Sequence, residues 1–212
     1  MKLRIQDLYY KEGSFVKRIV IVTTIVFFGI TGCSRGGPTE SEVRNTLAKY
    51  TDKKGCASSL LFKELPVKES LVESNKHILN PLVNVGLIEK AGNAYVPTSL
   101  GMSVYDVDAS GFCYTDQYVI TDITVMKEES KGDLSPALSG AWYVSFKISP
   151  NNVREWVKDP RLIKAASLAS IENITGTKSF TVRLAKKVGD SKLIVADPGF
   201  SFSPGIHFNL GW

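Results

Sequence analysis

The chain has 212 residues, of which 43% are hydrophobic and 22% charged, as in an ordinary globular protein of one or two domains. Its formal net charge is +5, but much of the excess lies in residues 1–32, which hold five basic and two acidic residues. The rest of the chain has 21 basic and 19 acidic residues. This near-neutral balance argues against nucleic-acid binding by long-range attraction, so we expect no nucleic-acid partner.

An apolar run of twelve residues, 19–30, follows the basic pair Lys17-Arg18. The run is shorter than the roughly 20 residues needed to span a bilayer core, and it matches the apolar centre of a signal peptide. The sequence Ile30-Thr31-Gly32-Cys33 comes next: an aliphatic residue, two small residues and a cysteine. This order resembles the lipobox of bacterial lipoproteins. The alternative is an uncleaved core helix, but the flexible composition of residues 34–38 argues against it.

The resemblance covers residues 17–33 and implies that residues 1–32 are a signal peptide, removed after Gly32. It also implies that the sulfur of Cys33 receives diacylglycerol and that the new amino group is acylated, for example with palmitate. Two or three acyl chains anchor a protein stably to a membrane, with residues 33–41 as the lipidated tether. We interpret residues 1–15 as the product of a translation start that was assigned too far upstream. Ser34 after the cysteine favours the outer membrane, facing the periplasm, in a cell that has one.

Cys56 and Cys113 remain after Cys33, and an even pair in an exported protein most often forms a disulfide. The bridge would close a loop of about 58 residues, which the chain-entropy model values at roughly 3–4 kcal/mol. The alternatives are two free core thiols or half of a metal site. No CxxC or HxxxH spacing supports the metal site, and the two histidines, His77 and His207, lie far apart in sequence. We expect no metal and no cofactor.

Residues 42–110 are predicted to form a small helical module. One helix, capped by Thr39 or Ser41, should run to about Tyr50. A second helix, capped by Ser74 or Asn75, should begin or kink at Pro81 and end at Gly86. Its expected buried residues are Ile78, Leu79, Leu82, Val83 and Val85. Two short strands then flank the turn Gly92-Asn93, and Thr98 caps a further helical turn.

The block GLIEKAGNAYVPTSLG, residues 86–101, follows the apolar helix and resembles the end of a winged-helix domain. The resemblance covers roughly residues 42–105 and implies a fold more than a function. Winged helices usually bind DNA with a one-sided basic face. Here the basic residues of 60–92 are matched by acidic ones: Lys63, Lys68, Lys76 and Lys90 by Glu64, Glu69, Glu73 and Glu89. We therefore expect a packing or protein-contact element.

Residues 111–212 are predicted to form an antiparallel sheet with helical cover, which places the protein in the α+β class. Strands are expected within 112–126, 142–148, 180–184, 193–196 and 206–212, from alternation and β-branched or aromatic content. Ser149-Pro150 has the form of a helix start, and Pro160 separates that helix from a second run at 161–171. Residues 127–138 are expected to form an exposed loop.

Motifs that would indicate catalysis or cofactor binding are missing from the sequence: GxSxG, the P-loop, HExxH, GxGxxG and the EF-hand pattern. A Ser-His-Asp site would have to use His77 or His207, and we interpret both as structural. We expect the chain not to be an enzyme.

Two further sets of side chains could bind a ligand. Asp106 and Asp108 could hold calcium with Ser110 or Asp116, but calcium takes six to eight oxygens, so a solvated loop is the better interpretation. An aromatic groove could be lined by Trp142, Tyr143, Phe146, Trp156 and Trp212, although aromatic residues at such spacings more often form a core.

Together these patterns predict a lipid-anchored envelope protein whose non-catalytic body binds a protein partner. A lipoprotein that binds a small ligand or an inhibitor, in a pocket between the N-terminal module and the sheet, is the alternative. A cell-wall or lipid hydrolase is the third hypothesis.

Overall fold

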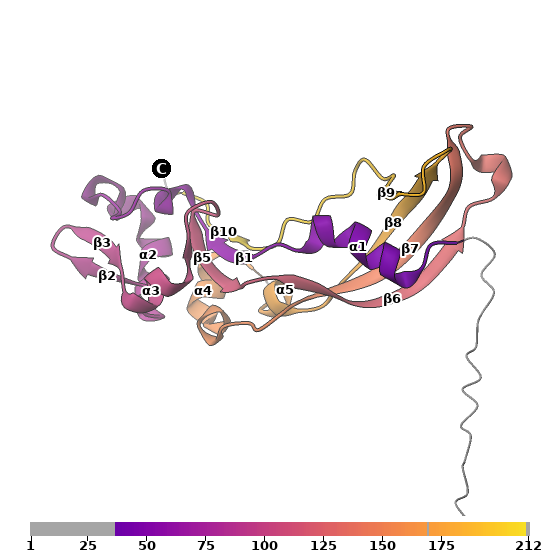
Figure 1. Ribbon diagram of the computed structural model, residues 1–212. Coiled ribbons are helices and arrows are strands. Elements are labelled where there is room, and N and C mark those ends of the chain that lie inside the picture. Colours follow the sequence, from indigo (N-terminus) through magenta and orange to yellow (C-terminus); the bar gives the residue numbers. More distant parts are fainter. Residues whose placement is uncertain (1–36, 169, 211–212) are drawn as a thin grey trace, which may run out of the picture. The chain divides into compact units, whose positions relative to one another are not determined.

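The computed structural model describes residues 37–168 and 170–210 (Figure 1). The predicted signal peptide, Cys33 and Trp212 lie outside the described residues. The described part has the predicted α+β class, with two sheets of four strands, a separate hairpin and short helices.

The long sheet is antiparallel and has the strand order β6-β7-β8-β9. Its strands are β6 (Tyr118–Glu128), β7 (Leu138–Pro150), β8 (Lys178–Lys187) and β9 (Leu193–Val195). Along β7 the side chains alternate as predicted, because Trp142, Val144, Phe146 and Ile148 are buried on one face. On the other face Tyr143 and Lys147 are exposed.

Helix α1 (Glu40–Thr51) packs on the buried face of the long sheet through Val43 and Leu47 (Figure 1). Thr39 caps it as predicted: its hydroxyl accepts the Glu42 N–H, and the Glu42 carboxylate accepts the Thr39 N–H at 2.7 Å. The same carboxylate lies 3.0 Å from the Lys186 ammonium on β8. The Thr39 N–H and then Lys186 lower the pKa of Glu42 to about 2.

The short sheet has the order β10-β1-β5-β4 and the bounds β1 (Gly55–Ser58), β4 (Tyr105–Asp106), β5 (Gly111–Thr115) and β10 (Ile206–His207). β10 runs parallel to β1, and the other pairs are antiparallel. The predicted closing strand at 206–212 is therefore only two residues long within the described part.

Helix α2 (Lys76–Asn84) buries Ile78, Leu79 and Leu82 and is followed by Gly86 at φ +75°, a backbone angle that favours glycine. The predicted burial of Val83 is wrong, since its side chain is 37% exposed. Pro81 lies inside the helix, which starts five residues earlier than that proline.

The predicted hairpin and its helical turn are confirmed. β2 (Ile88–Ala91) pairs with β3 (Ala94–Pro97), and Thr98 caps α3 (Ser99–Val104) by accepting the Gly101 N–H at 3.0 Å. The remaining helical segments are η1 (Leu60–Phe62), η2 (Glu69–Leu71), η3 (Glu73–Asn75), η4 (Lys131–Asp133), η5 (Glu155–Lys158), α4 (Pro160–Ala165) and α5 (Glu172–Thr175).

Two predictions about helices in the second half are wrong. Ser149-Pro150 does not start a helix, because β7 continues its pairing with β6 as far as Pro150, which lies opposite Tyr118. The helix predicted at 161–171 is shorter: α4 ends at Ala165, Ser167 has a φ of +54°, and the next helix, α5, begins only at Glu172. Long-range pairing overrides the local start signal in the first case, and a left-handed residue interrupts the run in the second.

The described residues form two apolar cores. The α2 core holds Phe62, Leu79 and Phe112 among others, with contributions from 57–114, 157–174 and 206–208. The sheet core holds Leu47, Phe146 and Leu184 among others, with contributions from 43–47, 118–148 and 182–202. Residues on both sides of position 110, where we expected the module boundary, contribute to each core. Glu40 and Ser41, which we assigned to the end of the tether, belong to helix α1.

Shortening Leu47 to alanine should destabilise the protein strongly. Its side chain is fully buried between α1 and the long sheet, so Leu47→Ala removes apolar contacts and leaves a cavity. We expect the free energy of unfolding to fall by roughly 2–5 kcal/mol, measured by urea denaturation. The matched control is Leu60→Ala, since Leu60 is 74% exposed. Similar losses for both variants would contradict the packing of α1 on the sheet.

Candidate functional site

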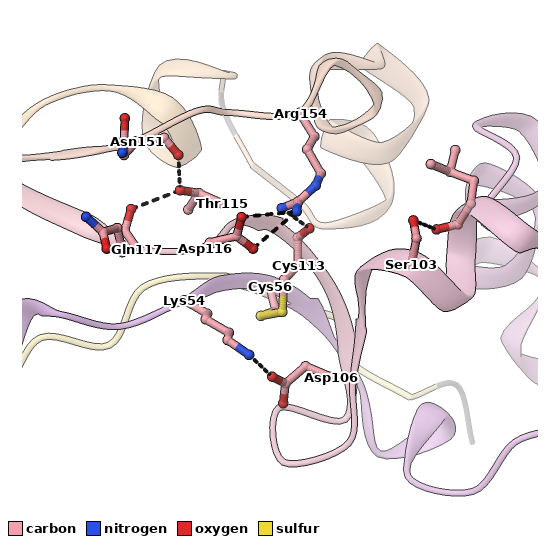
Figure 2. Close-up of polar contacts among 11 residues, drawn as sticks. Lys54, Cys56, Ser103, Asp106, Cys113, Thr115, Asp116, Gln117, Asn151 and Arg154 are labelled. Carbon is pink, nitrogen blue, oxygen red and sulfur yellow. Dashed lines mark hydrogen bonds and ion pairs between the residues drawn. A yellow bond between two sulfur atoms is a disulfide. The ribbon is translucent and has the colours of Figure 1, made fainter.

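The predicted disulfide between Cys56 and Cys113 is present (Figure 2). The two cysteines face each other across the antiparallel pair of β1 and β5, and their side chains are only 4% and 3% exposed. The bond joins positions 57 residues apart and makes both free thiols and a metal half-site impossible for this pair. Because the bond is buried, its position favours a structural role over exchange with external thiols.

Two ion pairs lie on either side of the disulfide in Figure 2. The Lys54 ammonium lies 2.5 Å from the Asp106 carboxylate and ties the residue before β1 to β4. The Arg154 guanidinium contacts both carboxylate oxygens of Asp116, at 3.1 and 3.2 Å, and donates to the Cys113 carbonyl at 3.0 Å. Each of these contacts connects segments that are far apart in the sequence.

The Lys54 ammonium holds the pKa of Asp106 below its ordinary value, and the Ala109 N–H, which donates to the same carboxylate at 2.9 Å, adds to this effect. Asp106 therefore anchors the turn between β4 and β5. Its carboxylate is paired with the Lys54 ammonium of the same chain.

The chain passes between the two cores at this junction, and neighbouring crossing segments are hydrogen-bonded to one another. The Tyr118 N–H donates to the Lys53 carbonyl at 3.1 Å, and the Asn151 N–H donates to the Gln117 carbonyl at 3.0 Å. The Thr115 hydroxyl lies within hydrogen-bond distance of the Gln117 and Asn151 carbonyls and can donate to one at a time (Figure 2). These bonds satisfy main-chain groups that would otherwise lie unpaired between the sheets.

A pair of buried tyrosines links the two cores. The hydroxyls of Tyr114, in the α2 core, and Tyr118, in the sheet core, lie 2.8 Å apart. The Tyr118 hydroxyl donates to the Ile174 carbonyl at 3.2 Å, so Tyr114 donates to Tyr118. Burial raises the pKa of both phenols above the ordinary value, which keeps them neutral and suited to a fixed structural bond.

The two histidines lie on different elements with different neighbours. The His77 imidazole, on α2, lies 3.1 Å from the Asn209 carbonyl. His207, on β10, is exposed and lines a shallow hollow with Ser110 and Phe208, with no hydrogen bond to a serine among the described residues. The structure does not bring either imidazole together with a hydroxyl and a carboxylate in this part of the chain.

The carboxylates and aromatic residues considered as ligand sites are also dispersed. Asp106 pairs with Lys54 and Asp116 with Arg154, and within 37–168 and 170–210 no group of three or more His, Cys, Asp or Glu residues could hold a metal ion. The aromatic residues are divided: Trp142 and Phe146 in the sheet core, Trp156 against the α2 core, and Tyr143 exposed. They do not line a common groove.

In the part of the chain that the structure describes, no helix has the length and hydropathy needed to cross a membrane. No protein-family model matches the chain, and neither do any curated proteins or solved structures.

Sequence reasoning missed the residues that hold the junction together, above all Lys54, Thr115 and Arg154. No local pattern marks them, because each contacts a segment more than thirty residues away. Tyr118 was identified only as a strand residue. Its partner Tyr114 lies four residues earlier in the same β-rich stretch, and this spacing of two tyrosines was a sequence sign of the pair.

Removing the disulfide should weaken the fold. We expect Cys56→Ala/Cys113→Ala to lower the free energy of unfolding by roughly 3–4 kcal/mol, because the unfolded chain regains the freedom that the closed loop removes. Urea denaturation with and without reductant checks this: reductant should destabilise the wild type and leave the double variant unchanged. Cys33→Ala is the matched control and should retain full stability of the body. A loss under about 1 kcal/mol would contradict the structural role of the bond.

Acid should remove the contribution of Asp106. Since its pKa is lowered in the folded state, its stabilisation is present above the ordinary range of a carboxyl and is lost as pH falls through the folded-state value. We expect Asp106→Asn to be less stable near neutral pH, by up to about 1 kcal/mol, and to lose less stability on acidification. Asp108→Asn, an exposed neighbour with the same charge change, is the control. Equal pH profiles for wild type and Asp106→Asn would contradict the Lys54 pairing.

Proposed function

We propose that this chain is a bacterial envelope lipoprotein, anchored through lipid on Cys33, whose folded body acts by binding a protein partner. The observation that carries the proposal is the buried Cys56–Cys113 disulfide. Disulfides of this structural kind form and persist in oxidising compartments and are rare in the bacterial cytosol. This agrees with the export signal but is independent of it, since the two features share no residue.

The distance between anchor and body also supports the proposal. Helix α1 begins at Glu40, so residues 34–39 separate Cys33 from the first helical residue. Six extended residues span about 20 Å. A lipid on Cys33 would therefore keep the body close to the membrane surface, in the region where other envelope proteins are encountered. Ser34 favours the periplasmic face of an outer membrane, where the cell has one.

The engagement of the reactive side chains supports binding over catalysis. Asp106 and Asp116 are paired with Lys54 and Arg154, and the His77 imidazole contacts a main-chain carbonyl. Each of these groups contributes to linking elements of the fold.

Lipidation and export can be tested together. Cells expressing the full chain are fed a palmitate analogue, and the membrane fraction is examined for label and for free thiols. We expect the wild type to carry label and to have Cys56 and Cys113 oxidised. Cys33→Ala should lose the label and leave the membrane fraction, because the acceptor sulfur is gone. Cys56→Ala/Cys113→Ala is the control and should stay labelled.

Deleting residues 19–30 gives a second arm, in which the chain should stay in the cytosol with Cys56 and Cys113 reduced. Label that persists in Cys33→Ala would refute the anchor. A fully oxidised pair in the deletion variant would remove the disulfide as support for export. The binding part of the proposal fails if gentle detergent recovers the lipidated protein without any stoichiometric partner.

A further inference from the structure

A groove lies between two helices of the α2 core, away from the disulfide junction. Helices α2 (Lys76–Asn84) and α4 (Pro160–Ala165) pack against each other, and the groove between their outer faces has a volume of about 510 Å³. Ligand sites for small molecules commonly have volumes of roughly 300–1,000 Å³. The groove is therefore large enough for a compact ligand.

Helical spacing explains why basic and amide side chains line this groove. On α2 the residues Lys76, His77, Asn80 and Asn84 follow one another at intervals of one, three and four, which places them on one side of the helix. The opposite side of α2 carries the buried core residues. On α4, Arg161 and Lys164 face the groove while Leu162 is buried. Both helices thus direct basic side chains to the same space.

The positive charges of Lys76, Arg161 and Lys164 are not balanced within the lining of the groove, which holds no carboxylate. Asp159 accepts two hydrogen bonds from the Arg161 guanidinium, at 2.9 and 2.7 Å, and compensates most of that charge. Among the described residues, the ion-pair partner of Lys76 is Glu73, whose side chain is 85% exposed, so this weak surface pair can open for a ligand. Lys164 enters none of the ion pairs within residues 37–168 and 170–210.

The floor of the groove adds an apolar component. Pro81 and Ala165 line it, and the methylene chains of long basic residues can extend such a surface. The amides of Asn80 and Asn84 are exposed at the rim and can donate hydrogen bonds. An occupant that fits would carry negative charge at one end and an apolar body at the other.

We propose that the groove between α2 and α4 binds a small organic anion, a carboxylate or phosphate monoester joined to an apolar chain or ring. Lys76 and Lys164 attract the anionic group, and the Asn80 and Asn84 amides orient it. The apolar body lies over Pro81 and Ala165. This inference does not depend on export or lipidation, so its test is separate from that of the proposed function.

The test uses the full-length chain reconstituted in phosphatidylcholine nanodiscs, with calorimetric titration of three probes. Hexyl phosphate carries both features, inorganic phosphate carries only the charge, and hexyl glucoside carries only the apolar chain. We expect saturable binding of hexyl phosphate, weaker binding of inorganic phosphate and none of hexyl glucoside. Lys76→Gln/Lys164→Gln should weaken hexyl phosphate binding by about tenfold or more, because each lost charged hydrogen bond costs more than a neutral one.

Lys127→Gln/Lys131→Gln is the matched control, since it removes the same charge from exposed lysines outside the groove. Thermal unfolding of all variants verifies that they are folded. Unchanged binding in Lys76→Gln/Lys164→Gln, or a loss of the same size in the control, would overturn the proposal. Equal affinity for inorganic phosphate would overturn the apolar part of the ligand, and equal affinity for hexyl glucoside would overturn the anionic part.

Discussion

The pairing of β1 with β5, locked by the Cys56–Cys113 disulfide, is the constraint on which most of the described fold depends. β1 is the strand to which β10 adds near the end of the chain, and β5 is the strand to which β4 adds. The chain segments next to this pair belong to the sheet core: α1 comes just before β1, and β6 comes just after β5. Fixing β1 against β5 therefore also fixes the end of α1 and the start of β6, which both belong to the sheet core.

Hydrogen bonds and an ion pair connect further segments to this strand pair. The Tyr114–Tyr118 hydroxyl pair places one buried phenol in each core, and the Arg154 guanidinium adds the segment after β7 by binding the Cys113 carbonyl and Asp116. In the low-dielectric surrounding of the two buried tyrosines, their hydrogen bond is stronger than in water and also costly to leave unmade. Loss of one hydroxyl of this pair would therefore leave the other without its buried partner.

The local chemistry of the sequence predicted many elements correctly. Thr39 and Thr98 cap the helices expected of them, Gly92-Asn93 turns the hairpin, and the alternation along residues 142–148 gives a half-buried strand. In these cases the deciding interactions lie within a few residues of one another. At Ser149-Pro150 the deciding partner is distant, and the prediction was wrong because pairing with β6 extends the strand.

The disulfide was predictable from the sequence, whereas the contacts around it were not. Counting cysteines in an exported chain leaves one natural pairing, so no geometry was needed for Cys56 and Cys113. The interleaving of the two cores, the ties through Lys54 and Arg154, and the approach of α4 to α2 all depend on tertiary packing. Charges that look balanced along residues 60–92 can therefore still gather in one groove, because α4 brings Arg161 and Lys164 beside Lys76.

Dividing a body of this size between two cores has an energetic consequence that the disulfide addresses. The fraction of surface buried on folding rises with the size of a core, so two small cores stabilise a chain less than a single large one. Covalent closure of the loop from Cys56 to Cys113 lowers the conformational entropy of the unfolded chain. The closed segment carries α2, the β2–β3 hairpin and α3. The α2 core, which includes that segment, should therefore depend on the bond more than the sheet core, whose strands β6, β7 and β8 pair along most of their length without it.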